Sequence, residues 1–191
     1  MLVILKSLIL PRLDYCSQLW SPRDQTSINA IEKVQKDFIS QIKDPSLDGK
    51  NYWEKLSLLG VTSQERRREK QQICFIWKLS QGLVDGYSVS WTFNERRGRL
   101  AVPKPIKNTA PAKVRNARES SLAVHGVKLF NLLPASLRNE DSGDVALFMN
   151  HLDIYLSEVP DQPTITGMGR AAKTNSLVDQ IPLWSIDNFI A

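Results

Sequence analysis

Two cysteines and two histidines are the residues of this chain whose types suit nucleophilic or metal chemistry. Cys16 lies in the stretch LPRLDYCSQLW, directly after an aspartate and a tyrosine. A catalytic thiol needs a nearby imidazole or a helix N-terminus to lower its pKa. His125 and His151 are far along the chain from Cys16 and Cys74, and the spacing fits no metal-ligand pattern. We therefore expect two small buried cysteines, no metal site and no cofactor.

Nucleotide and phosphoryl-transfer chemistry finds no motif in the sequence. Neither G-x-x-x-x-G-K-[ST] nor G-x-G-x-x-G occurs. Two-metal phosphoryl or nucleotidyl transfer needs clustered carboxylates, but the chain has no adjacent Asp-Asp pair, and Glu140 and Asp141 lie in a polar turn. Nucleotide hydrolysis and two-metal phosphoryl transfer are therefore not indicated by the sequence.

Positive charge gathers in the middle of the chain. Between Thr62 and Arg118 there are 13 Lys and Arg residues against 4 Asp and Glu, although the whole chain has 25 against 20. A polyanionic partner, RNA or DNA as duplex or single strand, or a solvated basic face explains this excess. Trp91 and Phe93 are candidates for stacking on unpaired bases. The candidate nucleic-acid-binding residues are Arg66, Arg67, Arg68, Lys70, Arg96, Arg97, Arg99, Lys104 and Lys107.

Helical periodicity supplies the elements that position these residues. Apolar residues three and four apart predict an amphipathic helix between Asp24 and Lys43. A short helix over 51–61 ends at Gly60, and Thr62 or Ser63 caps a longer helix that carries the first four candidate basic residues. Those four cannot all point inward, so we expect an exposed basic face.

The remaining segments predict a mainly α fold, a helical bundle with a basic loop or weak hairpin. The predicted divisions are a helical domain over 1–87, which the resemblance described below makes thumb-like, the basic loop over 88–120, C-terminal helices over 121–159 and a disordered or loosely docked tail over 160–191. A length of 191 residues with 42% hydrophobic and 24% charged residues is typical of a globular protein.

The N-terminal stretch predicts packing rather than chemistry. Residues 2–9 are nearly all apolar, which indicates a helix buried on most sides. In the next helix we expect Tyr15, Leu19 and Trp20 to wedge against the 24–43 helix, with Trp20 as a core residue.

The compartment follows from cysteine usage and hydropathy. Two cysteines 58 positions apart predict a reducing, intracellular compartment, the cytoplasm or nucleus. MLVILKSLIL is not expected to be a signal peptide, because Lys6 interrupts its apolar run and Pro11 follows. No membrane span is expected.

Six strings in order resemble one known family. They are 12-RLDYCSQLW-20, 31-IEKVQKDFISQI-42, 56-LSLLGV-61, 96-RRGRL-100, 127-VKLFNLLPASL-137 and 148-FMNHLDIYL-156. Together, over about 2–157, they resemble the region after the polymerase core in LINE-type (non-LTR, jockey-like) retrotransposon reverse transcriptases. The resemblance implies a helical thumb and extension that packs on the palm and helps hold the template-primer duplex. The chain departs from the family pattern at Phe130, where Trp is usual, and at Met149, where Lys is usual.

Several hypotheses about function follow. Because the family's catalytic aspartates lie upstream of the resembling region, the leading one is a truncated reverse transcriptase-like protein without polymerase activity that retains RNA or DNA binding. Alternatives are a helical protein-interaction module, whose first helix docks a reverse transcriptase palm or another helical protein, and a non-functional translated remnant. A Cys16-dependent hydrolase is the third alternative.

Overall fold

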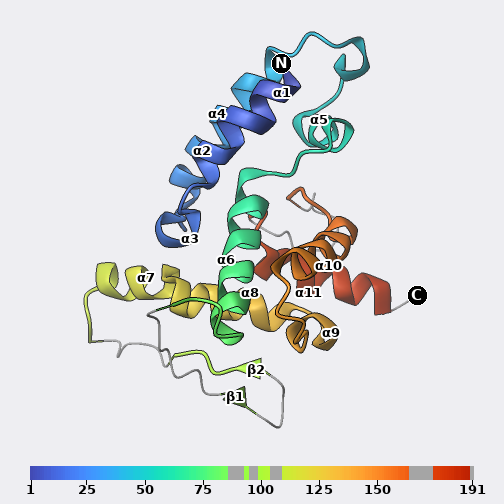
Figure 1. Cartoon of the computed structure of the whole chain (residues 1–191). Coiled ribbons are helices and arrows are strands. Elements are labelled where there is room, and N and C mark those ends of the chain that lie inside the picture. The colour runs from blue at the N-terminus through green and yellow to red at the C-terminus, as the bar shows by residue number, and fades with distance from the viewer. Residues whose placement is uncertain (86–92, 95–98, 104–108, 164–173, 190–191) are drawn as a thin grey trace.

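The computed structural model describes residues 1–85, 93–94, 99–103, 109–163 and 174–189, and this part of the chain is mainly helical (Figure 1), which confirms the predicted fold class. The N-terminal helices form one arm, α6 runs down the middle, and α7 to α11 lie around its lower half (Figure 1). In the described ranges no helix combines the length and the apolar character needed to cross a membrane.

The N-terminal arm consists of short helical segments paired with one long helix. Its elements are α1 Leu2–Ile4, the π-helix η1 Leu5–Ile9, α2 Leu10–Asp14, α3 Ser17–Trp20, α4 Gln25–Ser40, the 3-10 turn η2 Pro45–Leu47 and α5 Tyr52–Leu59. The predicted amphipathic helix is confirmed as α4, whose N-cap Asp24 accepts a hydrogen bond from the Ser27 N–H. The predicted stop of α5 is also confirmed, since Gly60 has φ 58°. A small apolar cluster joins Leu5, Leu10, Ile39, Leu56 and Val61.

The first helix is not buried on most sides, which corrects the sequence prediction. Within α1 and η1 only Leu5 is buried, and Val3 is 77% exposed. The segment is one helix deep at the edge of the arm, so only one of its faces meets α4. Its use as a docking surface for another protein stays a prediction.

Helix α6, Gln64–Ser80, is the column to which the other elements attach. Its N-cap is Ser63, as predicted, and it contacts α2, α3, α4, η3, α8 and α10. Its buried face includes Ile73, Ile76 and Trp77, and the Trp77 ring stacks on Phe148 with centroids 4.3 Å apart. This face and the buried residues of α8, α10 and α11 form the larger core.

The lower half follows the predicted order of elements. A two-residue hairpin of β1 Phe93–Asn94 and β2 Arg99–Leu100 confirms the basic loop or weak hairpin. Then come α7 Ala112–Ser120, the π-helix η3 Leu122–Gly126, α8 Val127–Leu132, α9 Ala135–Arg138 and α10 Val145–Glu158. Helix α7 lies wholly within the segment that was predicted as the basic loop.

The described part of the C-terminal tail contains a docked helix, and docking was one of the two predicted alternatives for this tail. Leu177–Phe189 form α11, which contacts α8, and Leu177 and Ile181 are buried in the larger core. Leu177 and Ile181 are four residues apart and therefore lie on one face of α11. Hydrogen bonds from Ser176 and Leu177 to Glu69 hold the start of the helix against α6.

Candidate nucleic-acid interface

The structure corrects the prediction of an exposed basic face on α6. Arg66 and Arg68 are almost completely buried, whereas Arg67 and Lys70 are partly exposed. Buried guanidinium groups cannot contact a polyanion on the surface. Arg66 and Arg68 are therefore removed from the set of phosphate-binding candidates.

Arg66 is buried because the chain after α10 supplies acceptors for it. One of its terminal nitrogens donates to the Pro160 carbonyl oxygen at 2.8 Å and the other to that of Val159 at 3.3 Å. The Asp161 carboxylate lies 3.9 Å from Nε. Burial lowers the pKa of the Arg66 guanidinium, and the charges of Asp161 and Glu69 oppose this shift. Arg66 thus holds α6 to the end of α10.

Arg68 is buried among acidic residues of the same helix and of α4. Burial lowers the pKa of its guanidinium, and the charges of Glu32 and Glu65 oppose the shift. An arginine that compensates several buried carboxylates has a structural role.

Arg67 and Lys70 each have an acidic partner. Arg67 Nε donates to the Asp14 carboxylate at 3.1 Å, and its Nη2 donates to the same group. Lys70 pairs with Asp153 of α10. These ion pairs attach α6 to α2 and α10, so they neutralise half of the predicted basic face.

The loop candidates divide into one described residue and four others. Arg99 lies on β2 and is exposed. The neighbouring Leu100 is held by two hydrogen bonds with the Asn131 side chain of α8. Outside the described residues lie Arg96, Arg97, Lys104, Lys107 and the stacking candidate Trp91.

A groove of about 790 Å³ separates α3 and the linker that follows it from α7 and η3. We call it the α3–α7 groove. Leu19, Trp20 and Arg23 line one side, and Asn116 and Lys128 are among the residues of the other. The first wall is thus apolar and aromatic at α3, and the opposite wall is polar and contains both Glu119 and Lys128.

The aromatic wall corrects a second sequence prediction. Trp20 is 41% exposed and Leu19 is 75% exposed, so neither is the core wedge that the helical spacing predicted. The chain turns between α2 and α3 at Cys16, which has φ 52°, and α3 then packs on α6 through a face that includes the buried Ser17 and leaves Leu19 and Trp20 outside. Trp20 Nε1 donates to the Tyr15 carbonyl oxygen at 2.7 Å, which fixes the indole at the groove.

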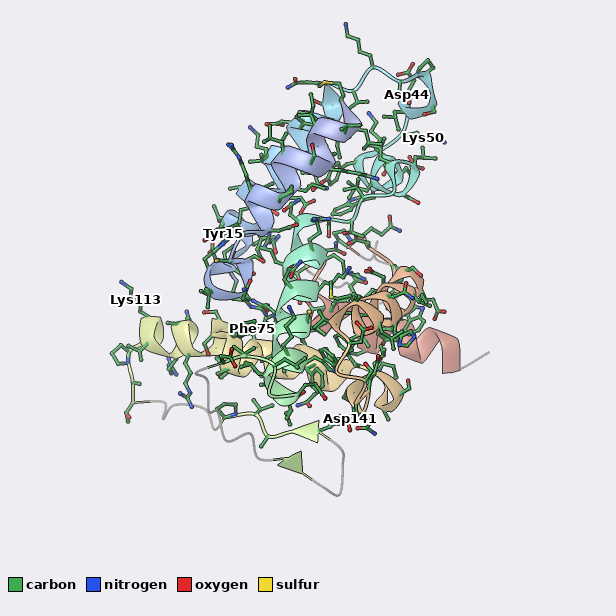
Figure 2. All side chains as sticks on the ribbon, viewed as in Figure 1. Tyr15, Asp44, Lys50, Phe75, Lys113 and Asp141 are labelled. Carbon is green, nitrogen blue, oxygen red and sulfur yellow. The ribbon has the colours of Figure 1, made fainter. Side chains whose placement is uncertain are left out.

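Next to the polar wall, helix α7 carries basic residues that were not among the predicted candidates and that lie outside the lining of the groove. Lys113, Arg115 and Arg118 are set against one acidic residue of this helix, Glu119, which pairs with Lys128 at 2.7 Å. Lys113 and Asn116 share a helix face because they are three residues apart, and Figure 2 shows Lys113 at the outer end of α7 and Tyr15 near α3. The signal was present in the sequence as AKVRNARES, a short helix with three cations.

The floor of the groove is a buried group of charges. Arg23 Nη1 contacts His125 Nε2, which lies 3.3 Å from Glu69 Oε1. Glu69 also accepts hydrogen bonds from the Ser176 hydroxyl at 2.5 Å and the Leu177 N–H at 2.6 Å. No local pattern in the sequence indicates this cluster, because its hydrogen-bonded pairs are up to 108 positions apart.

Ionisation of the two acids in this cluster differs. Burial opposes ionisation of Glu69, but His125 and the donors of Ser176 and Leu177 outweigh it and lower the pKa. Burial and the charge of Glu69 raise the pKa of Glu65 to about 7. Near neutral pH, the cluster therefore carries one firmly ionised carboxylate beside one that titrates.

Nucleophilic and metal chemistry receive no structural support in the described ranges. Cys74 is buried as predicted, and burial raises the pKa of its thiol. Cys16 is half-buried. In these ranges no three His, Cys, Asp or Glu side chains are grouped as a metal site would require.

No protein-family model, curated protein or solved structure matches this chain.

Proposed function

We propose that this protein is a non-catalytic helical module that binds single-stranded RNA or DNA in the α3–α7 groove. We propose further that it is a counterpart of the thumb and extension of LINE-type reverse transcriptases. The ordered set of six strings in the sequence supports the second part. The observation that carries the first is an exposed, oriented Trp20 in a groove that Arg23 and Lys128 also line, beside the basic helix α7.

The two walls suit the two parts of a nucleotide. An indole presents a flat face on which any base can stack, and stacking of this kind contributes about 1–3 kcal/mol per base. Lys113 lies on α7 three residues from Asn116, which lines the groove, and we place it at a backbone phosphate, where a contact adds affinity that falls with salt. Trp20 is already oriented by its bond to Tyr15, so little conformational entropy is lost when a base stacks on it.

The binding mode differs from the one expected from the sequence. The basic excess between Thr62 and Arg118 still contains the proposed cations of α7, but α6 no longer contributes its buried arginines. The groove is open to a flexible strand. Bases that are paired and stacked within a duplex cannot stack on its aromatic wall. We therefore expect single strands to bind better than duplex.

The test is a fluorescence anisotropy titration with a labelled oligouridylate of about 12 nucleotides, a length within the site sizes of single-strand binders. Trp20→Ala should weaken binding about tenfold and Lys113→Glu a further several-fold, with a shallower salt dependence for Lys113→Glu. Lys50→Glu is the matched control because Lys50 is exposed at the far end of the arm from α7 (Figure 2).

Trp20→Phe separates stacking from folding. Phenylalanine keeps a flat ring but loses the hydrogen bond to Tyr15, so this variant should retain most of the affinity that Trp20→Ala loses. Equal weakening by Lys50→Glu and Lys113→Glu, or no binding by the unmodified protein at low salt, would contradict the proposed function.

A further inference from the structure

One nitrogen atom at the floor of the α3–α7 groove has two incompatible neighbours. His125 Nε2 contacts the donor Nη1 of Arg23 and also lies 3.3 Å from the acceptor Oε1 of Glu69. An imidazole nitrogen carries either a lone pair, which accepts, or a proton, which is donated. His125 Nε2 can therefore accept a hydrogen bond from Arg23 or donate one to Glu69, but it cannot do both at the same time.

We propose that Arg23 is a phosphate-binding residue of the groove and that protonation of His125 releases it for this role. The inference rests on the proposed function and adds its regulation. In the neutral state, the Nε2 lone pair accepts the hydrogen bond from Arg23 and the ring proton is on Nδ1. In the protonated state, Nε2–H donates to Glu69, and the imidazolium repels the guanidinium.

Glu69 is the fixed member of the three groups. Its carboxylate is held by the Ser176 hydroxyl and the Leu177 N–H and is 3% exposed. It cannot follow a moving partner without leaving those donors buried and unsatisfied. When His125 turns its proton to Glu69, the group that moves is Arg23.

Arg23 is in a position to move into the groove. It belongs to the linker between α3 and α4, its side chain is 36% exposed, and it lines the groove. Its ion pair with Glu69 spans 3.7 Å, which is longer than a direct hydrogen bond. A backbone phosphate in the groove offers the released guanidinium a bidentate partner.

The surrounding charges define which controls are needed. On α6, the charges of Glu69 and Arg68 both act on Glu65. At the rim, Lys128 of α8 and Glu119 of α7 neutralise one another. Asp24 caps α4. Glu65 titrates near pH 7, in the same range as imidazoles. Glu65→Gln therefore serves as the control for the second titrating group.

The experiment measures oligouridylate binding against salt at pH 8 and at pH 6. One more phosphate contact at pH 6 should steepen the slope of log K against log salt by about 0.7. The change should be absent in His125→Gln and in Arg23→Gln, and it should persist in Glu65→Gln. A slope that is the same at both pH values in the unmodified protein, or a change that persists in Arg23→Gln, would overturn the proposal.

A second measurement needs no nucleic acid. Nitrogen-15 NMR of the histidine ring follows protonation of His125, and the Arg23 guanidinium signals report its release. We expect the Arg23 signals to broaden and exchange faster with the same midpoint as His125. If the protein binds no oligonucleotide, the proposed function fails while this measurement still decides the release: Arg23 signals that do not change would refute it.

Discussion

Glu65 has a carboxyl group whose ionisation is opposed by burial. Its pKa is raised to about 7 from an ordinary value of 4.5, because of burial and the nearby charge of Glu69. The folded state holds this proton over a pH range in which the unfolded chain has released it. Stability is therefore greatest below pH 4.5 for this group and falls as pH rises to 7 and above.

Glu65→Gln should remove this pH dependence. The amide oxygen can still accept the Asn175 N–H that Glu65 accepts at 3.1 Å, and it carries no charge at any pH. Urea unfolding at pH 5 and pH 8 should show that the unmodified protein loses up to about 3 kcal/mol more than the variant over this range. Parallel changes in both proteins would contradict the raised pKa.

Residue-level burial was the least predictable property of the chain. Arg66 and Arg68 are found inside because their acceptors arrive from Pro160, Val159 and several carboxylates, which a local helical pattern cannot show. Trp20 is exposed because the chain turns at one left-handed residue, Cys16, and α3 then packs on α6 through another face. Neither the distant acceptors of the two arginines nor the left-handed backbone of Cys16 produces a periodic pattern in the sequence.

Helix α6 and the π-helix η3 approach closely at Gly126. A Cβ atom there would lie 2.8 Å from Leu122 Cδ1 and 3.0 Å from Ile76 Cγ1. The Gly126 backbone has φ −59°, so the glycine is required by space and not by conformation. The absence of this side chain allows the two elements to share the larger core.

Gly126→Ala should destabilise the protein by about 1–2 kcal/mol, since overpacking outweighs the better helix propensity of alanine. The measurement is urea unfolding, followed by circular dichroism. The double variant with Leu122→Val, which removes the nearest Cδ1 atom, should lose less than the sum of the single changes. A stabilised Gly126→Ala protein would show that the elements separate without cost.

Whole elements were predicted wherever a cap and an apolar period coincide. The Asp24 cap of α4, the Ser63 cap of α6 and the Gly60 stop of α5 are local signals, and the structure has each of them. Helix α11 was missed because it contains Pro182 and its first turn depends on acceptors from α6. Helix α7 was missed in part because it buries none of its residues.

At the scale of the whole molecule, the C-terminal segment is held by carboxylates of α6 as well as by apolar contact. Glu69 accepts from Ser176 and Leu177, and Glu65 accepts from the Asn175 N–H. The same Glu69 forms the floor of the α3–α7 groove through His125 and Arg23. One carboxylate thus joins the groove, α6 and the last helix.

Glu69→Gln should therefore loosen α11 and destabilise the protein by about 3 kcal/mol. The amide nitrogen of glutamine cannot accept the hydrogen bonds that the carboxylate accepts from Ser176 and Leu177. Asp153→Asn is the matched control: Asp153 pairs with Lys70 but is 57% exposed, so its loss should be below about 1 kcal/mol. Urea unfolding gives both values, and hydrogen exchange locates the effect. We expect faster exchange at the Leu177 amide in Glu69→Gln and not in Asp153→Asn. Equal losses of stability in both variants, or a Leu177 amide that stays protected, would mean that apolar packing of Leu177 and Ile181 holds the segment without Glu69.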